Sequence, residues 1–568
     1  MTTSGSGLGA EQGTARLWLE ALATAMGRQL RAEWFGSPPH LLRLSRPRAR
    51  AFAAFPRDFR PARADTGRAL LSGVFDLGGR VMMLGAGGDP WDRTSPSRTF
   101  AVELHKFGWL RHLNAAGEAG ARESLRLVIA WARTFGRWNA FSWSGEVLER
   151  RVFNLACNMG PLAALASDAE VEQLAGLVAR QARQLLMTQD PAGRAAERAA
   201  VAAAAAAMLD GRAGQRLLAK CLDRLNRLLP VVVLPDGGHV SRAPEAGMEL
   251  LFDLLALDDG WAQRGLEAPL EAARAIDRLT AGMRFYTLAD GRLARFQGGA
   301  EADAADVAAA RAHDDAEAAA PAAQSPHSGY QRIMGKTIQV MVDSGTPAPG
   351  VWSLTACAQT SALEVVCGGE RLITNAGWTP RIQDAQALRL TDGGSTAALG
   401  HGSSGRLLDR WPGRVLGPRL VGGPTKVDVR RAESEAGIWL DVRHDGWAKA
   451  LGITHERRLF VDFAADELRG EDLFNPITPG ALRVIPYMVH FHLPPDVEAA
   501  VARDNQSILL RGPSQKGWWL RNDAVEVRVE PSIAFKDGRQ ITSHQVLLMG
   551  HLRADKGGRV RWKLTAVE

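Results

Sequence analysis

The segment 234–244, with the sequence LPDGGHVSRAP, holds the side chains best suited to acid-base chemistry. His239 ends a glycine-rich turn, and an imidazole titrates near neutral pH, so His239 could serve as a base or an acid. Arg242 follows, and a guanidinium can bind a carboxylate through two parallel hydrogen bonds. A turn histidine can equally cap the next helix or bond a neighbouring carbonyl, and a lone surface arginine usually has no specific role. We therefore treat His239 as the candidate base and Arg242 as the candidate carboxylate-binding group.

The chain contains only 3 tyrosines, so a phenol that could act as an acid is quickly traced. Tyr330 follows His327 and Ser328 in a loop that leads into an extended segment, which makes it our candidate acid. Tyr286 ends a helical stretch and Tyr487 lies within the apolar run VIPYMVHF, so we expect both to be core residues.

Four further side chains are candidates for substrate binding. Asn154 and Asn158 stand at positions i and i+4, which places both amides on one helix face. Trp138 belongs to a local group of tryptophans, and an aromatic face suits a sugar ring, whereas His401 lies in the loop-like segment GHGSSG. Hydrogen bonding between packed helices would explain the two asparagines, and core packing would explain the tryptophan equally well.

His490 and His492 alternate along one extended segment and so share a face, a spacing that permits metal binding. Because no third ligand is evident, they are weak candidates for a structural divalent metal. The 4 cysteines are scattered and lack CxxC spacing, which argues against a disulfide framework or a zinc site. The sequence therefore requires no cofactor.

The formal net charge is +7, carried mostly by arginine, which suits an anionic polysaccharide as a partner. Spread over 568 residues, this charge also fits simple solubility. The densest basic stretch, between Arg43 and Arg63, contains proline and phenylalanine and lacks the periodicity of a DNA-reading helix. We therefore expect no nucleic-acid partner, and the number of subunits stays open.

No segment contains about 18 uncharged apolar residues in a row, so we expect no transmembrane helix. An export signal has a basic start followed by an apolar core. The N-terminal residues of this chain lack that pattern. By these criteria alone the chain is neither exported nor membrane-spanning.

Helical spacing dominates the first half of the chain. An N-terminal helix is expected over 14–35, and the alanine-rich run 199–207 is expected to form an inner packed helix, because alanine favours helix and permits close contact. Further helices separated by Gly, Pro or Asp are predicted at 99–115, 120–136, 144–166, 168–187, 193–209, 213–229, 244–257 and 267–286. Helices in series without strands favour a toroid of helical hairpins.

After an acidic, alanine-rich stretch the apolar period changes to two, as in SALEVVCGGERLITNAG and RVRWKLTAV. About ten short strands need a second layer over their apolar faces, which predicts an antiparallel β-sandwich. The expected fold class is α+β and multidomain, an (α/α) toroid followed by that sandwich. The expected division is an N-terminal helix and arm (1–96), the toroid (97–297), a linker (298–326) and the sandwich (327–568).

Several motifs in this order resemble the heparinase II/III-type polysaccharide lyases, a family related to the alginate lyases. They include PWD at 90–92, GRW at 136–138, LPDGGHVSRAP at 234–244, HSGYQRI at 327–333, HDGW at 444–447 and FHLPPDV at 491–497. The resemblance covers about residues 70 to 565. It implies the same toroid and sandwich, and a periplasmic location, which the N-terminus does not support; the location stays open.

The resemblance also implies β-elimination on a uronic acid unit. A donor neutralises the substrate carboxylate, a base removes the C5 proton, and an acid protonates the leaving oxygen. Several positions that the resemblance implies differ here. Ala246 or Gly247 replaces the usual tyrosine, and residues near 194–198 lack the Asn-His pair. Cys357 or its neighbours, and Gly394, stand where histidines are expected.

Two functions remain open at this stage. The first is a lyase that acts on an acidic, uronic-acid-containing polysaccharide, with His239, Tyr330 and Arg242 as catalytic residues. The second is a catalytically inactive relative that binds a glycan or a cell-envelope partner.

Overall fold

The computed structural model describes residues 6–188, 191–299, 302–316, 319–380, 385–477, 483–536 and 539–567, with the backbone alone for residues 6–14 and Lys536. By its contacts the chain divides into two compact units. Unit 1 comprises Met1–Val232, Glu249–Ile276 and Leu408–Pro418, and unit 2 comprises Val233–Met248, Asp277–Leu407 and Arg419–Glu568. Each unit therefore combines stretches that are distant in the sequence. The segment boundaries expected from the sequence stay a prediction.

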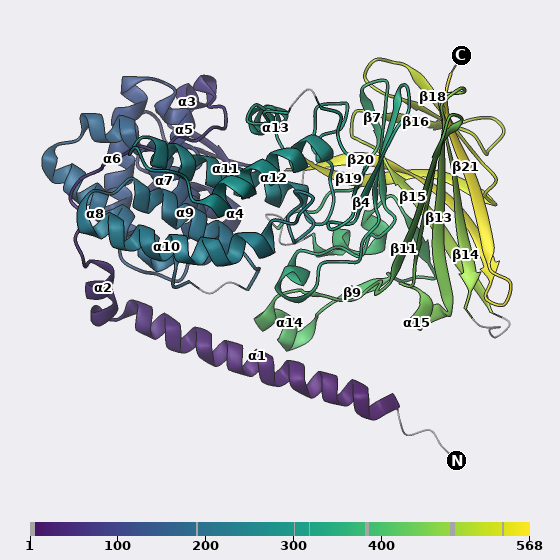
Figure 1. The fold of residues 1–568 in the computed structure, drawn as a ribbon, viewed down its shortest axis with the longest axis horizontal. Coiled ribbons are helices and arrows are strands. Elements are labelled where there is room, and N and C mark those ends of the chain that lie inside the picture. The colour runs from purple at the N-terminus through teal and green to yellow at the C-terminus, as the bar shows by residue number, and fades with distance from the viewer. Residues whose placement is uncertain are drawn as a thin grey trace. The chain divides into compact units, whose positions relative to one another are not determined.

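Unit 1 is built of helices that follow one another with short breaks (Figure 1). A two-stranded antiparallel hairpin interrupts the helices near the start of the chain. The elements are α1 (Ser6–Gly36), α2 (Pro38–Leu44), α3 (Ala64–Leu71), β1 (Val74–Leu77), β2 (Arg80–Met83), α4 (Arg98–Lys106), α5 (Leu110–Asn114), α6 (Glu118–Phe135), α7 (Gly145–Leu165), α8 (Asp168–Leu185), α9 (Ala195–Ala207), α10 (Gly211–Val232) and α14 (Arg410–Leu416). Helices α11 (Pro244–Ala262) and α12 (Leu270–Tyr286) contribute residues to both units.

Helix α9 lies in the interior of unit 1. It packs against α7, α8 and α10, and residues 199–207 are all fully buried. Alanine side chains allow neighbouring helices to approach closely, because no larger side chain holds the backbones apart. The prediction of an inner packed helix is confirmed.

The prediction of one helix over 99–115 is wrong. Helix α4 ends at Lys106 because Phe107 adopts a left-handed conformation with φ 64°, and α5 begins only at Leu110. The break turns the chain so that Phe107 and Trp109 are both buried, with ring centroids 5.4 Å apart. Burial of two aromatic rings outweighs the local preference for a continuous helix.

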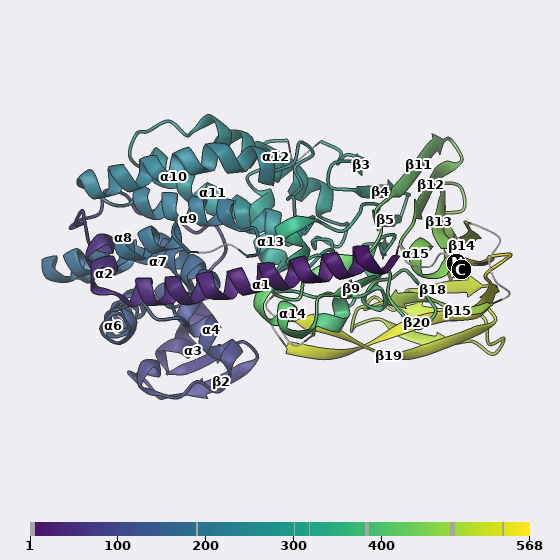
Figure 2. The same cartoon turned by 90° about the horizontal axis from the view of Figure 1, so that it is seen from below.

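The long helix α1 runs beside α14 in both views of the fold (Figures 1 and 2). The ring of Trp18 in α1 stacks on that of Trp411 in α14, with centroids 5.2 Å apart and planes inclined by 10°. A helix from the start of the chain is thus held by a segment from far later in the sequence. Over the described residues we find no helix with the length and hydropathy that a membrane crossing needs.

Unit 2 consists of antiparallel sheets and the short helices α13 (Ala304–Arg311) and α15 (Ala448–Leu451). Its strands are β3 (Gln324–Ser325), β4 (Tyr330–Met334), β5 (Ile338–Asp343), β6 (Leu363–Cys367), β7 (Glu370–Ile373), β8 (Ala397–Leu399), β9 (Gly405–Leu407), β10 (Leu420–Gly422), β11 (Val427–Ser434), β12 (Gly437–His444), β13 (Ile453–Asp462), β14 (Glu467–Pro476), β15 (Val484–His492), β16 (Glu498–Val501), β17 (Ile508–Arg511), β18 (Gly517–Asn522), β19 (Glu526–Lys536), β20 (Arg539–Arg553) and β21 (Gly558–Ala566).

Three sheets share the core of unit 2. An 8-stranded sheet has the order β11-β12-β13-β14-β21-β18-β17-β16, a 4-stranded sheet has the order β19-β20-β15-β8, and a 5-stranded sheet has the order β3-β4-β5-β6-β7. One hydrophobic core joins inward-facing side chains from all three sheets, for example Val340, Leu440 and Val489. The expected fold class, a helical region followed by an antiparallel β-sheet domain in an α+β chain, is confirmed.

Candidate functional site

The DGGH turn and the loop before β4 meet within unit 2. The Asp236 carboxylate accepts hydrogen bonds of 2.7 Å from the backbone N–H groups of His327 and Ser328, and another of 2.7 Å from the Ser328 hydroxyl. Burial alone would raise the pKa of Asp236, but the bonds from Ser328 and Gly238 outweigh it and hold that pKa below its ordinary value. Asp236 thereby ties the motif LPDGGHVSRAP to the motif HSGYQRI. Both motifs were recognised in the sequence, but Asp236 was not predicted to connect them.

His239 is buried and bonded within its own turn. Its Nδ1 lies 2.7 Å from the Ser241 hydroxyl and accepts a 3.1 Å hydrogen bond from the Ser241 backbone N–H. Because Nδ1 is an acceptor, the neutral imidazole carries its proton on Nε2. Nδ1 therefore bonds the hydroxyl and the N–H of Ser241 rather than a neighbouring carbonyl, which was the alternative to a catalytic role.

Arg242 lies in the interior of unit 2, and its guanidinium is surrounded by oxygen atoms. It donates to the backbone carbonyls of Ser328 (2.7 Å), Thr346 (2.8 Å) and Gly329 (3.0 Å), and it forms an ion pair with Asp343. Asp343 is fully buried and also accepts from Gln297 at 2.7 Å. A substrate carboxylate would therefore have to displace bonds that Arg242 already makes. Asp343, at the end of β5, is a second partner that sequence reasoning missed.

Tyr330 lies directly against Arg242. Its hydroxyl donates a 2.6 Å hydrogen bond to the backbone carbonyl of Arg242, and the guanidinium carbon lies 4.9 Å from the centroid of its ring. The side chain is fully buried, and burial raises the pKa of the Tyr330 phenol well above its ordinary value. Tyr286 packs edge-on against the same ring, and burial raises its pKa to about 12. The prediction that Tyr286 and Tyr487 are core residues is confirmed.

The structure thus brings His239, Arg242 and Tyr330 together in one region of unit 2, with Arg242 and Tyr330 in direct contact. Their catalytic roles stay a prediction. The arrangement as it stands joins two loops to strands β4 and β5 through hydrogen bonds inside the protein.

The candidate substrate-binding residues lie apart from this cluster in the sequence and have other contacts. Asn154 donates to the Lys106 carbonyl and Asn158 donates to the Asn154 carbonyl, both at 2.9 Å, so each amide bonds backbone in unit 1. Trp138 is half-buried, with its ring centroid 5.8 Å from that of Phe35. His401 is exposed in a turn between β8 and β9.

The two histidines of β15 bond other groups of the protein. Both ring nitrogens of His492 are engaged, Nδ1 with the Ser532 hydroxyl at 2.9 Å and Nε2 with the Asp392 carbonyl at 2.8 Å. His490 Nδ1 lies 3.0 Å from Gln545, and its Nε2 is 3.8 Å from the Asp392 carboxylate. In the part of the chain that the structure describes, no three His, Cys, Asp or Glu side chains are grouped as metal ligands.

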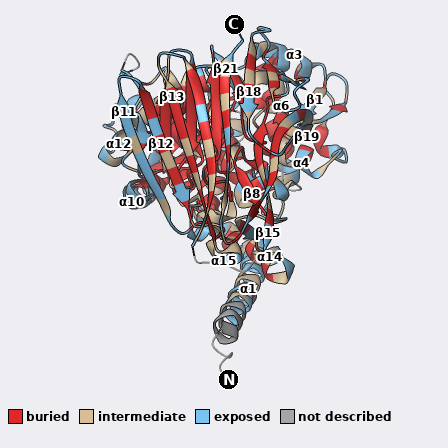
Figure 3. Ribbon diagram, turned by 90° about the vertical axis from the view of Figure 1, so that its right-hand side faces the viewer, coloured by how far each residue is buried: buried red, intermediate tan, exposed pale blue. Residues whose placement is uncertain are grey.

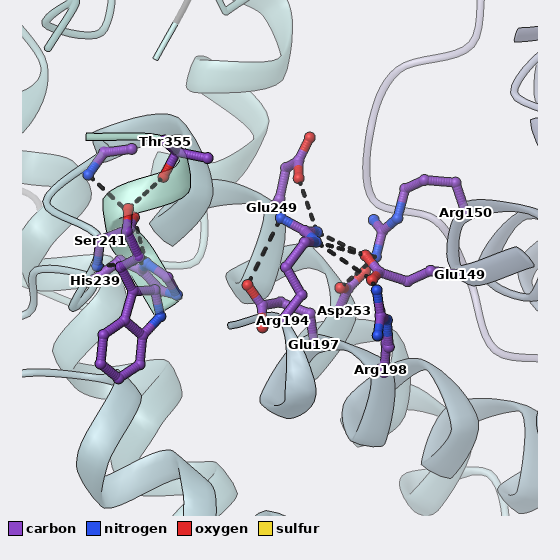
Figure 4. A network of polar contacts seen from close by, with 12 residues as sticks. Glu149, Arg150, Arg194, Glu197, Arg198, His239, Ser241, Glu249, Asp253 and Thr355 are labelled. Atoms are coloured by element: carbon purple, nitrogen blue, oxygen red, sulfur yellow. Dashed lines mark hydrogen bonds and ion pairs between the residues drawn. The ribbon is translucent and has the colours of Figure 1, made fainter. Parts of the chain in front are cut away.

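A network of buried ion pairs joins α7, α9 and α11 within unit 1 (Figure 4). Glu149 accepts a 2.6 Å hydrogen bond from Arg194 and lies 3.4 Å from the guanidinium of Arg198. Arg150 donates to Asp253 at 2.6 Å. Asp253 is fully buried, and burial raises its pKa to about 7 although the charge of Arg150 acts in the opposite direction.

The family model described as heparinase II/III-like, C-terminal, matches residues 317–563. FtsZ-localized protein C of Caulobacter vibrioides (strain NA1000 / CB15N) is 48% identical over 558 residues, which cover 97% of this chain and 96% of that protein. The chain belongs to the heparinase II/III-like family.

Solved structures of heparinase II/III-like lyases share the fold. The crystal structure of heparinase III aligns with a TM-score of 0.66 at 13% identity, covering 93% of this chain and 89% of that one. Heparan sulfate lyase HepC from Pedobacter heparinus aligns with a TM-score of 0.55 at 13% identity, covering 92% and 86% of the two chains. At this identity the likeness concerns the fold alone.

The ion pairs of unit 1 occupy a stretch to which the family resemblance gives a chemical role. Residues 194–198, where the resemblance places a carboxylate-binding Asn-His pair, here contain Arg194, Glu197 and Arg198. Arg194 contacts Glu149 and also Glu249, at 3.2 Å. Sequence reasoning singled out this stretch but missed Glu149 and Glu249, because they lie 45 and 55 residues from Arg194.

Proposed function

We propose that this chain is a non-catalytic member of the heparinase II/III-like family that acts by binding and localises with FtsZ. Support for the localisation comes from the relative that is 48% identical along nearly the whole chain, whose name places it with FtsZ. Such identity over both full lengths favours a shared role over a shared fold alone. The proposal takes the second of the two functions that the sequence left open.

One observation carries the non-catalytic part: the Tyr330 hydroxyl and the Arg242 guanidinium already have hydrogen-bond partners inside the protein. β-Elimination needs a proton-transferring group that reaches the sugar and a donor that is available to its carboxylate. The Tyr330 hydroxyl is fully buried and donates to the Arg242 carbonyl, while the guanidinium binds Asp343 and three carbonyls. Both groups therefore stabilise the fold in the state described.

The network around Glu149 supports the same conclusion from unit 1. A substrate carboxylate at residues 194–198 would compete with Glu149 and Glu249 for the same guanidinium groups. A buried charge that loses its partner costs several kcal/mol, so these arginines favour their internal carboxylates over an exchangeable ligand.

The first test is a lyase assay. The full chain is incubated with alginate, heparan sulfate and hyaluronan, and the ultraviolet absorbance of unsaturated uronate products is followed, with an active heparinase III as positive control. We expect no increase above the no-enzyme rate. An increase that disappears in His239→Ala would support the lyase and contradict the non-catalytic proposal.

The second test concerns localisation. A fluorescent fusion of the full chain is imaged together with labelled FtsZ in the cell. We expect the two signals to coincide and the fusion to disperse when FtsZ is depleted. A pattern that is unchanged by FtsZ depletion would contradict this half of the proposal and leave the lyase result unaffected.

A further inference from the structure

Strand β11 is an unusual edge of the 8-stranded sheet. It is 8 residues long and contains no proline, and most of its residues are exposed (Figure 3). The other sheet edges of the core are short or interrupted: β16 and β7 have 4 residues, β8 has 3, β3 has 2, and β19 contains Pro531. Charged side chains, here Asp428, Arg430, Arg431 and Glu433, select against indiscriminate pairing at an edge. A long edge strand that carries them can still pair with an extended chain of complementary charge.

The backbone of β11 has a defined outward register. The Asp445 N–H donates to the Lys426 carbonyl, which begins the pairing between β11 and β12. Hydrogen-bonding groups along an antiparallel strand alternate between its two sides. The backbone groups of Val429, Arg431 and Glu433 therefore point away from β12, toward the position that a further strand would take.

The outer face beside this edge carries a partly uncovered tryptophan. Trp439 of β12 stacks on Phe460 of β13 with ring centroids 4.3 Å apart, yet it remains 50% exposed. The reason is its neighbour on the other side: the cross-strand partner of Trp439 on β11 is Ala432, whose methyl group covers little of the indole. A strand added beside β11 would place a side chain opposite Ala432, and a large apolar one could reach the indole.

Two residues before Ala432, on the same face of the sheet, β11 carries a charged side chain. Arg430 is exposed and is the cross-strand partner of Asp441. A side chain opposite Arg430 on an added strand would be two residues from the side chain opposite Ala432, because side chains on one face of a strand have a period of two. An acidic residue there would pair with Arg430.

We propose that β11 is a docking edge for an extended peptide segment of a protein partner, with a large apolar side chain opposite Ala432 and an acidic side chain opposite Arg430. The inference goes beyond the proposed function, because it assigns a surface and a partner chemistry and depends on neither FtsZ nor lyase activity. A polysaccharide would use the indole and the charges but not the backbone register of the edge.

The test uses the full-length protein and a labelled synthetic peptide of 8 residues, the length of β11. Threonine occupies every second position of the peptide, and leucine and glutamate alternate at the positions between, so that they lie on one face of the strand. Binding is followed by fluorescence anisotropy. Val429→Pro removes an N–H that points away from β12, a position at which an edge strand tolerates proline. Trp439→Ala removes the apolar contact, and Trp34→Ala, at an exposed tryptophan of unit 1, is the matched control.

We expect saturable binding that weakens roughly tenfold or more in Val429→Pro, in Trp439→Ala and with lysine in place of glutamate in the peptide, and that is unchanged in Trp34→Ala. Circular dichroism checks that each variant is folded; if Val429→Pro is not, Trp439→Ala and the lysine peptide decide the outcome. Absent binding overturns the proposal, as does binding that a folded Val429→Pro leaves intact. If heparin binds more strongly than the peptide, and its binding is weakened by Trp439→Ala but not by Val429→Pro, the surface binds polysaccharide instead. That result also overturns the proposal.

Discussion

The hydroxyl of Tyr330 donates a 2.6 Å hydrogen bond to the backbone carbonyl of Arg242, and the guanidinium of Arg242 lies over the ring of Tyr330. The two residues are 88 positions apart in the sequence. Their contact joins the loop after the DGGH turn to strand β4, so a candidate acid and a candidate carboxylate ligand become a structural pair.

Tyr330→Phe tests the structural value of this hydroxyl. The change removes one buried hydrogen bond and keeps the ring, so we expect the free energy of unfolding to fall by about 1–2 kcal/mol in urea denaturation. Tyr487→Phe in β15 is the matched control, since no hydrogen bond of its hydroxyl is found among the described residues. Equal stability of the two variants would mean that the Tyr330 bond contributes nothing net.

Gly237→Ala tests why the DGGH turn contains glycine. Gly237 has φ +80°, and a Cβ atom there would lie 2.1 Å from the Arg278 carbonyl oxygen, so backbone would have to move. We expect a loss of at least ~3 kcal/mol in thermal unfolding. Gly265 has φ +65° with open space around it, so Gly265→Ala should cost only about 1 kcal/mol. Similar losses would show that backbone conformation, rather than the close approach, requires the glycine.

Asp253 makes the stability of unit 1 depend on pH. An aspartate in the unfolded chain releases its proton near its ordinary pKa of 3.8, whereas burial holds that proton on folded Asp253 up to about pH 7. The folded state binds more protons between these values, so the free energy of unfolding falls as the pH rises from about 4 to 7.

Asp253→Asn removes this titration while keeping an acceptor for Arg150. In the parent protein, the free energy of unfolding should change by up to ~4 kcal/mol between pH 4 and pH 7. In Asp253→Asn, we expect a flatter profile of unfolding free energy against pH. Asp223→Asn at an exposed position of α10 should leave the profile unchanged. A slope that persists in Asp253→Asn would assign the pH dependence to other groups.

Asp472 is the centre of a buried polar group within unit 2. It accepts hydrogen bonds from His455 and Arg457, both at 2.8 Å, and from the Trp562 indole at 3.0 Å. Asp472→Asn would leave the fully buried Arg457 without its counter-charge, so we expect a loss of about 3–5 kcal/mol.

Asp523→Asn is the comparison for that variant, because Asp523 pairs with Arg561 at the surface. Exposed ion pairs contribute less than about 1 kcal/mol, so this change should be nearly neutral. Both free energies are measured by denaturant titration at neutral pH. If the two variants lost equal stability, the buried position of Asp472 would have no special importance.

The sequence located helices such as α7 and α8 because helical conformation depends on the spacing of residues a few positions apart. The prediction of 144–166 corresponds to α7 at Gly145–Leu165, and that of 168–187 corresponds to α8 at Asp168–Leu185. The break at Phe107 escaped it although Gly108 follows directly, because a single glycine does not by itself end a helix. The turn is stabilised by the contact between the aromatic rings of Phe107 and Trp109.

For the candidate site, the sequence by itself determined which chemical groups are present: His239, Arg242 and Tyr330, and the charged side chains at residues 194–198. Only the tertiary structure decided what these groups contact. Asp236 reaches Ser328 across 92 residues and Arg242 reaches Asp343 across 101, and no periodicity or local motif records such pairings. The physical reason is that spacing along the chain governs backbone conformation, whereas the partner of a buried charge is fixed by how distant segments pack.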